Sequence, residues 1–555
     1  MYKEVRYFGP IAKVSDSGLA SGLEKDHFSY PDELTTRVTN AAGARSTYHY
    51  GVVAGQKRLL RVERNNVANC PDAQAITAYD ANGNVDFTED FDGNRTDYSY
   101  NAKGQLLQRI DGLSNVRPAT PRLTEYDWHP THNRIEAIRY YGASVNEPWL
   151  EERYTYFPDN DPRRHRLQRF ELINRSVHGV PNQVRTTSFD FVISSNGLVQ
   201  QRTVDGPMPG NADRVIEHFD AFGNLTLVEN DAQHQTRFEE FDPYGSPRRV
   251  TDANGYQTRF EFDAAGRMTA VQWMHAGQWV TRSFTRDAWG YLKSRTEPDG
   301  RVTRFVNDAG GRATEVILND DFMRWQYDSL GNPLELKFLR RKEFTYTCIP
   351  EPGAPCGGSH TEIREIEYFK RTWSRDALGR ATSDTNPASP SSQIFYDQSG
   401  RILETTDPLG HRQNMTYNAN GELAASTNEL GETTLFTYDA LGRLRQVRDH
   451  RGLETSYTYD GLGNLVKRQS PDTGLDEFWY DPAGRLERSR RNDGSELTYL
   501  YSDPLGRLTH VYAPGQTLQY SYDQCPNGKG RLCREDGEYG STQYAYSPSG
   551  QFQQL

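Results

Sequence analysis

The chain has 555 residues, of which 35% are hydrophobic and 12% aromatic; its net charge is −11 and its mean hydropathy is −0.83. The aromatic content argues against a disordered chain, and the negative charge argues against nucleic acid as a main partner. No apolar run approaches the roughly 18 residues that a membrane span requires, so we expect no span.

The N-terminal part, residues 1–75, is predicted to be an irregular, β-rich lead-in. Its first residues, MYKEVRYFGPIAKV, lack an apolar core segment, so no classical signal peptide is visible and the export route stays open. The segments YDANGNV (Tyr79–Val85) and YNAKGQL (Tyr100–Leu106) follow each other at period 21. They begin a repeat array that we assign to residues 76–555.

The array is degenerate over residues 111–210. YDWHPTHNRI (Tyr126–Ile135) is a damaged copy of the repeat, and its His129 and His132 are interpreted as loop residues. The basic run Arg163–Arg169 is interpreted as a solvated strand or loop, with a specific anionic partner as the less favoured alternative.

The pattern returns in the middle of the chain and continues to the C-terminal part. Between residues 334 and 373 we expect an insertion, which contains CIPEPGAPC. The copies begin at Phe219, Phe241, Phe262, Arg286, Tyr327 and Arg375, and a last one begins at Tyr546.

In the C-terminal third the repeat is strict. Tyrosine makes up 33 of 555 residues, so six further hits at a preset spacing have a chance probability on the order of 10⁻⁷. The repeat aromatics, which keep period 21 without a break, are Tyr396, Tyr417, Tyr438, Tyr459, Tyr480, Tyr501 and Tyr522.

Each repeat predicts two strands and two turns, with no room for a helix. Asp at the first position of a type I turn caps the backbone, and Gly at the fourth accepts the left-handed conformation of a hairpin bulge. In LETSYTY, residues 453–459, the bulky side chains alternate along one face. We expect such rings to stack into ladders along the sheet, at roughly 0.2–1 kcal/mol for each neighbouring pair.

The motif Tyr-Asp-x-x-Gly-Arg-Leu at period 21 resembles the YD or Rhs repeat over roughly Tyr79–Phe552. That repeat occurs in bacterial Rhs polymorphic toxins, the C subunit of insecticidal toxin complexes and teneurins. The resemblance implies an all-β fold: a continuous antiparallel β-hairpin sheet that spirals into a hollow shell or an open half-shell. In the toxin members the shell encloses a C-terminal toxic segment, released after a self-cleaving aspartate site. Nothing of that kind follows YSPSGQFQQL, so neither self-cleavage nor cargo is expected within the sequence given.

The size of the sheet can be estimated from the repeat. About 50 strands spaced about 4.8 Å apart give a strip roughly 240 Å long and about 20–25 Å wide. That area would wrap a sphere of radius about 20 Å, which holds a small peptide domain at most. A half-open cup is an equal alternative, since sheet twist supplies the curvature.

The cysteines give two candidate disulfides. Cys348 pairs with Cys356 and Cys525 with Cys533, because each pair is eight residues apart and flanks a Pro/Gly turn; reduced thiols are the alternative. Cys70 is left over, and a zinc site is not favoured because no close Cys-x₂₋₄-Cys unit occurs.

Catalytic and metal sites are not predicted. DANGNVD (Asp80–Asp86) resembles a calcium loop faintly but has Phe91 where the bidentate Glu should be. Carboxylates such as Asp503 recur in every repeat, as turn-forming residues do. We therefore predict no catalytic, cofactor-binding or metal residues and no cofactor.

The first functional hypothesis is a non-enzymatic shell segment that encapsulates or carries the cargo of a secreted bacterial polymorphic toxin. Its partners would be a toxin or effector cargo, or a companion shell subunit, at a secreted or cell-surface location. The alternative is an adhesin whose YD-repeat aromatics bind carbohydrate or a cell-surface receptor. An enzyme such as a glycosidase is the least favoured hypothesis.

Overall fold

The protein is an all-β chain folded as one antiparallel sheet. The computed structural model describes residues 4–8, 14–18, 25–65, 73–117, 121–141, 148–347, 359–386 and 389–554. Their 46 strands belong to one continuous sheet, and no helix occurs among them. The fold class predicted from the repeat is therefore confirmed.

The strands follow one another at short intervals along the chain. The first sixteen are β1 (Glu4–Phe8), β2 (Val14–Gly18), β3 (Asp26–Asp32), β4 (Thr35–Thr39), β5 (Arg45–Val53), β6 (Gln56–Asn65), β7 (Ala73–Tyr79), β8 (Val85–Glu89), β9 (Asn94–Tyr100), β10 (Leu106–Ser114), β11 (Arg122–Trp128), β12 (Ile135–Tyr141), β13 (Pro148–Tyr156), β14 (Leu167–Asn174), β15 (Val184–Ile193) and β16 (Val199–Asp205). The next fifteen are β17 (Val215–Phe219), β18 (Leu225–Asn230), β19 (Gln235–Phe241), β20 (Pro247–Thr251), β21 (Gln257–Phe262), β22 (Met268–His275), β23 (Gln278–Arg286), β24 (Leu292–Thr296), β25 (Val302–Asn307), β26 (Ala313–Leu318), β27 (Asp321–Tyr327), β28 (Pro333–Thr347), β29 (Ser359–Arg375), β30 (Ala381–Asn386) and β31 (Ser389–Tyr396). The last fifteen are β32 (Ile402–Thr406), β33 (Arg412–Tyr417), β34 (Leu423–Thr427), β35 (Thr433–Tyr438), β36 (Leu444–Arg448), β37 (Glu454–Tyr459), β38 (Leu465–Ser470), β39 (Gly474–Tyr480), β40 (Leu486–Arg490), β41 (Glu496–Leu500), β42 (His510–Ala513), β43 (Gln516–Tyr522), β44 (Leu532–Gly537), β45 (Gly540–Tyr546) and β46 (Phe552–Gln554).

The turn between β35 and β36 shows how a repeat folds. Gly442 N donates to Asp439 O at 3.1 Å, and Asp439 N donates to Arg443 O at 2.9 Å. The Asp439 carboxylate accepts the backbone N–H groups of Leu441 and Arg443, both at 2.9 Å. Gly442 has φ +83°, a conformation that costs a side chain but not glycine. The predicted type I turn with a glycine bulge is confirmed here.

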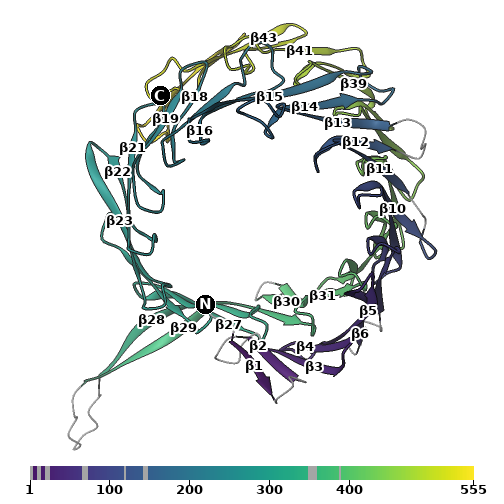
Figure 1. The fold of residues 1–555 in the computed structure, drawn as a ribbon. Coiled ribbons are helices and arrows are strands. Elements are labelled where there is room, and N and C mark those ends of the chain that lie inside the picture. The colour runs from purple at the N-terminus through teal and green to yellow at the C-terminus, as the bar shows by residue number, and fades with distance from the viewer. Residues whose placement is uncertain are drawn as a thin grey trace, which may run out of the picture.

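The strip of strands winds into a ring that overlaps itself (Figure 1). Turns after odd-numbered strands form one edge of the strip, which we call the odd edge; turns after even-numbered strands form the even edge. From the turn after β27 onward, the odd edge lies against the even edge of the earlier strands. Hydrogen bonds across this seam join residues 275 to 337 positions apart, so a separation of that size corresponds to one full winding of the spiral. We call the strands before the overlap the first winding and the strands that dock on them the second winding.

The wall is a single polar sheet. Apart from glycines, twenty-four described residues are at most 9% exposed, and only ten of them are hydrophobic: Ala44, Ala137, Tyr141, Phe157, Ile173, Ala270, Phe322, Leu339, Ala419 and Cys533. These positions are scattered from β5 to β44. Main-chain pairing and polar side-chain contacts therefore hold the array together more than a deep apolar core does.

The irregular parts of the sequence still join the sheet. Arg61 of β6 pairs with Ile76 of β7, so the sheet continues without a break across residue 75. The degenerate stretch 111–210 forms paired strands. The insertion is a lengthening of one hairpin, β28 with β29, which projects outward from the ring (Figure 1).

Candidate functional site

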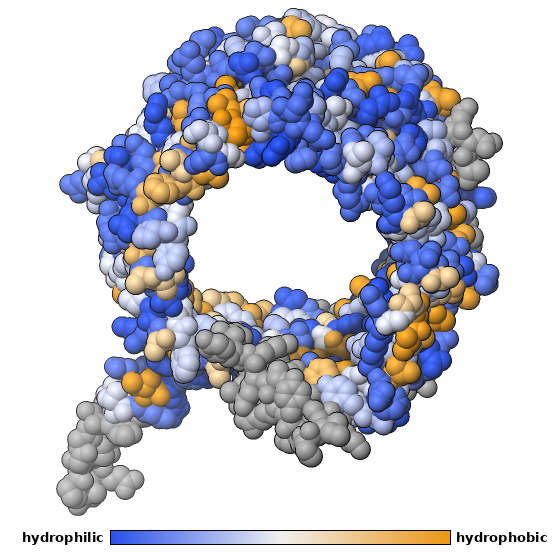
Figure 2. Space-filling model, in the orientation of Figure 1, coloured by the Kyte–Doolittle hydropathy of each residue, from blue (hydrophilic) through white to orange (hydrophobic). Residues whose placement is uncertain are grey.

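The ring surrounds an open space, which we call the lumen. Figure 2 shows that the passage runs through the molecule in this view and that the wall around it is largely hydrophilic. A lumen needs a wall that does not unwind, so the contacts that close the seam are the residues to examine.

The most buried seam contact joins Asn174 to Gly461. Asn174 is 0% exposed, and its Oδ1 accepts the backbone N–H of Gly461 at 2.9 Å. Its Nδ2 donates to His178 O and Val180 O at 2.7 and 2.9 Å. A Cβ on Gly461 would lie 2.0 Å from Trp149 O, so the backbones of the two turns touch directly.

Charged pairs flank this contact on one side. Arg122 Nη2 lies 2.8 Å from both carboxylate oxygens of Glu422, and these side chains are 21% and 17% exposed. Asp92 accepts from Arg117 at 3.1 Å and, across the seam, from Arg401 at 3.0 Å. Because these pairs are largely shielded from water, they stabilise the seam more than exposed pairs would.

The seam continues to the C-terminal strands. Arg185 Nη2 donates to Asn464 Oδ1 at 2.9 Å. Farther along, Asn254 Oδ1 accepts from Lys529 N at 2.9 Å, and Asn254 Nδ2 donates back to Lys529 O at 3.2 Å. The first winding is therefore bonded to the second at intervals, from the turn after β4 as far as the turn after β20.

Glu151, which belongs to the first winding, supports the contact between Asn174 and Gly461. It is 4% exposed, and Arg175 and Arg153 donate to its two oxygens at 2.6 and 2.8 Å. Burial raises the pKa of Glu151, but the two guanidinium groups outweigh that effect and hold the pKa below its ordinary value. The residue is therefore a charged anchor at neutral pH.

The seven repeat tyrosines lie at or just after the ends of odd-numbered strands, beside the odd edge. Burial raises the pKa of all seven, so their hydroxyl groups stay protonated donors. Six donate to a backbone carbonyl 14 or 15 residues earlier, at 2.7 to 3.0 Å: Tyr396, Tyr417, Tyr438, Tyr480, Tyr501 and Tyr522.

The predicted ring ladder is wrong for these tyrosines. No ring contact joins two of them in residues 389–554. Successive repeat tyrosines sit two strands apart, about 9.6 Å, which exceeds the roughly 4.5–7 Å of an aromatic pair. An arginine fills the gap instead: the guanidinium lies over the ring at 4.2 to 4.8 Å in Arg380–Tyr396, Arg401–Tyr417, Arg443–Tyr459, Arg485–Tyr501 and Arg507–Tyr522.

The same arginine also links successive turns. Arg443 pairs with Asp439 of its own turn at 2.6 Å and donates to Asp460 O of the next turn at 2.7 Å. No role was predicted for this arginine from the sequence, although the Gly-Arg of the motif was the available signal. An Asp–Arg–Tyr ladder thus replaces the expected ring ladder.

The turn carboxylates are occupied in the way that turn-forming residues are. Asp503 Oδ1 accepts from the backbone of Leu505 at 3.0 Å, and Oδ2 pairs with Arg507. Asp80, at the head of the segment that faintly resembled a calcium loop, accepts from Asn82 and Asn84 of its own turn, each at 2.9 Å.

A disulfide joins Cys525 and Cys533, whose Cα atoms are 5.4 Å apart. Cys348 and Cys356 lie outside the described residues, as does Cys70. The pairing of Cys348 with Cys356 stays a prediction.

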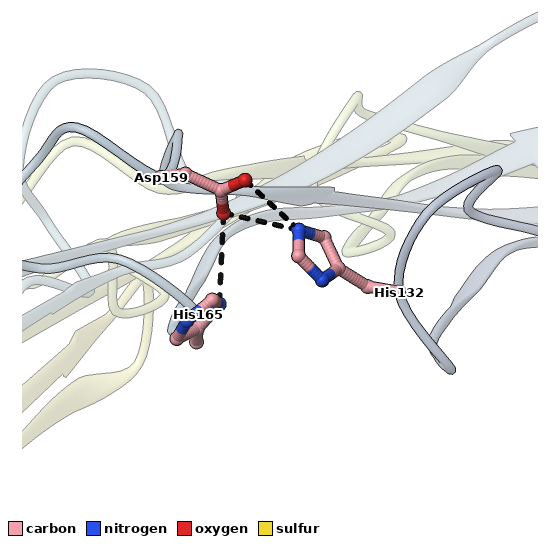
Figure 3. Close-up of side chains that lie close together, drawn as sticks. All are labelled: His132, Asp159 and His165. Carbon is pink, nitrogen blue, oxygen red and sulfur yellow. Dashed lines mark hydrogen bonds and ion pairs between the residues drawn. The ribbon is translucent and has the colours of Figure 1, made fainter.

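A cluster that sequence reasoning missed consists of His132, Asp159 and His165 (Figure 3). Its members come from two successive odd-edge turns, one after β11 and one after β13. The spacing gave no signal, because hairpin stacking rather than a local motif brings them together. Among the described residues, these three side chains form the group that could hold a metal ion.

Fold and seam together define the class of protein: a hollow β-shell wall wound from hairpin repeats. Family models match at two places, a teneurin YD-shell model over residues 360–549 and an RHS repeat model over residues 219–272. The Rhs/YD-repeat recognition made from the sequence is thereby confirmed.

A solved structure shows the same fold. A crystal structure of TcdB2-TccC3-TEV matches with a TM-score of 0.55 at 13% identity, covering 98% of this chain and 28% of that one. A crystal structure of TcdB2-TccC3-Cdc42 matches with a TM-score of 0.48 at 13% identity, covering 97% and 29%. The chain thus spans less than a third of the length of either. No curated protein matches the chain.

Among the described residues there is no helical segment of the length and hydrophobicity that a bilayer crossing requires.

Proposed function

We propose that the chain is a structural, non-enzymatic wall segment of an Rhs/YD shell, which encloses or carries the toxin or effector cargo of a secreted bacterial polymorphic toxin. The observation that carries this proposal is the locked seam: the strip overlaps itself and is bonded along the overlap, so a continuous wall surrounds the lumen. A wall of this kind separates a polypeptide inside it from proteases and solvent outside.

The free edges of the strip support a companion shell subunit as a second partner. On the odd edge of the first winding, Phe222 and Trp289 are 89% and 83% exposed. On the even edge of the second winding, Leu409 and Leu430 are 81% and 74% exposed. Exposed apolar side chains along a rim are typical of surfaces that another protein covers, and the passage seen in Figure 2 needs such a cover to enclose a cargo.

The adhesin alternative depended on the tyrosine stripes. Six of the seven hydroxyl groups are bonded to the backbone and a guanidinium group lies over five of the seven rings, so most of these tyrosines are already occupied by contacts within the wall. We therefore favour the shell.

The proposal can be tested by cryo-electron microscopy of the protein expressed from its natural reading frame together with the neighbouring frames. We expect ordered wall density with additional polypeptide density in the lumen, and protease resistance of that polypeptide. A ring with an empty lumen, with any co-purified toxin bound outside, would refute the encapsulating role. Specific saturable glycan binding by the chain alone would instead support the adhesin.

A further inference from the structure

We propose that His132, Asp159 and His165 form a binding site for a divalent transition-metal ion of the zinc type. The three side chains come from residues 129–134, between β11 and β12, and from residues 157–166, between β13 and β14. Figure 3 shows the two imidazole rings meeting at the Asp159 carboxylate. The inference does not depend on the proposed shell function.

The distances between donor atoms suit a small ion. His132 Nε2 lies 3.1 and 3.0 Å from the two Asp159 oxygens, and His165 Nδ1 lies 3.8 Å from Oδ1. All three donor atoms lie within 4.8 Å of one another. A tetrahedral zinc ion with bonds of about 2.0–2.1 Å needs its ligand atoms about 3.3 Å apart, so modest side-chain rotations would complete the site.

The chemistry of the donors selects the class of metal. Two imidazole nitrogens and one carboxylate oxygen suit zinc and its neighbours in the first transition row, whereas calcium and magnesium take oxygen ligands almost exclusively. Three protein ligands leave at least one coordination position for water or for a donor from another molecule. His132 and Asp159 line a recess of about 640 Å³, which gives an ion a route in.

The two turns that supply the ligands lack the Asp-x-x-Gly bulge of the regular repeats. In the first, the His129 ring nitrogen Nδ1 accepts the backbone N–H groups of Thr131 and His132 at 3.3 and 3.2 Å. In the second, His165 itself has φ +72°, a conformation that a side chain rarely adopts. A bound ion would join these neighbouring turns where the usual Asp–Arg link is absent.

One group in the structure opposes the ion. The Arg134 guanidinium donates to His165 Nδ1 and lies 5.1 Å over the Tyr156 ring. A cation at the site must displace this arginine from His165. Removing the positive charge at position 134 should therefore tighten metal binding.

The test is isothermal titration of the untagged, chelator-treated full chain with Zn²⁺, followed by visible absorption spectroscopy of the Co²⁺ form. We expect one ion for each chain at this site. His165→Gln, and the double variant His132→Gln/His165→Gln, should lower the affinity at least about tenfold, since even losing a supporting group around a metal has effects of that size. Arg134→Gln should raise the affinity several-fold.

The matched control is His411→Gln. His411 Nδ1 lies 2.9 Å from Asp407 Oδ2, and both side chains are exposed. Among the described residues, no third potential ligand lies beside this pair. This variant should bind Zn²⁺ as the parent does, and the melting temperatures of the metal-free proteins should agree. Zn²⁺ uptake that is unchanged in the double variant, as binding at the cysteines would give, overturns the proposal; so does the absence of saturable binding in the parent.

Discussion

The same turn occurs in two environments in this molecule, buried in the seam and free on the rim. In the second winding, Asp397 and Asp460 head odd-edge turns that dock on earlier strands, and they are 4% and 2% exposed. Among the described residues nothing is docked on the odd edge of the first winding, where Phe222 and Trp289 at the third turn position are 89% and 83% exposed. Asp242, which heads a turn of this free edge, is nevertheless only 8% exposed, and its carboxylate accepts backbone N–H groups of its own turn. The turn therefore folds by local chemistry in both places, and only the winding decides whether it also binds another part of the wall.

The difference between the seam and the free rim is tested most directly at Asn174. Asn174→Ala removes one of the two acceptors of the Gly461 N–H, the other being Ser176 Oγ, together with the side-chain donor to the His178 and Val180 carbonyl groups. We expect a loss of about 3 kcal/mol in unfolding free energy, because several hydrogen bonds of roughly 0.5–1.5 kcal/mol each are lost from a fully buried side chain. Thermal unfolding and hydrogen exchange of residues 176–183 and 460–464 would measure it.

Asn82 on the free odd edge is the control for that experiment. It occupies the third position of the turn headed by Asp80 and is exposed. Asn82→Ala should change the stability by less than about 0.5 kcal/mol. Unchanged exchange protection at residues 460–464 in Asn174→Ala would show that the seam does not depend on this contact.

A second test uses Gly461, the residue that follows Asp460 in its turn. Several other repeats have Ala or Pro at this position, as at Ala221, Ala440 and Pro482. A methyl group would meet Trp149 O at 2.0 Å, so Gly461→Ala should separate the two windings locally. We expect a loss of about 1–3 kcal/mol, the usual cost of overpacking.

The free rim again supplies the contrast. Ala221 holds the equivalent position, where it is exposed. Ala221→Leu should therefore be tolerated with little change in melting temperature. Equal destabilisation by Gly461→Ala and Ala221→Leu would mean that the turn itself, rather than the seam, limits the size of this residue.

The charged seam pair gives a smaller effect. Arg122→Gln should cost about 1–2 kcal/mol, since it removes a largely shielded contact with Glu422, whereas Arg202→Gln should cost about 0.5 kcal/mol or less because Arg202 is 45% exposed beside Glu217. Urea unfolding at low and high salt measures both. If salt and substitution affect the two pairs alike, the seam pair is no better shielded than the hairpin pair.

The sequence carried the repeat but not the winding. Period 21, the Asp and Gly turn positions and the absence of helices could all be predicted, because each depends on residues within one hairpin. The seam partners, such as Arg122 and Glu422, are 300 residues apart and depend on twist accumulated over many strands. Asn174 lies in the degenerate stretch, where no motif marks it. The ring ladder was mispredicted because each repeat contributes two strands, so successive repeat tyrosines lie about 9.6 Å apart, too far for an aromatic pair.

The comparison with the smallest expected effect is between odd-numbered strands that end in Tyr and those that end in Phe. Tyr438 donates to Leu423 O at 2.9 Å, while Phe241 on the free odd edge has no hydroxyl group to donate. In Tyr438 the bond can be studied alone, because Glu422 takes the place of the covering arginine found in five other repeats. Tyr438→Phe should therefore cost about 1 kcal/mol, the ordinary net contribution of one hydrogen bond.

Tyr396→Phe separates the two contributions of a repeat tyrosine. Tyr396 donates its hydroxyl to Ala381 O at 2.7 Å, while Arg380 lies 4.6 Å over the ring, a contact that a phenylalanine keeps. Arg380→Gln should then cost more than Tyr396→Phe, because it removes the cation above the ring together with the links to Asp376 and Asp397. If Tyr396→Phe proves the more damaging in chemical denaturation, hydroxyl bonding rather than the arginine ladder joins successive repeats.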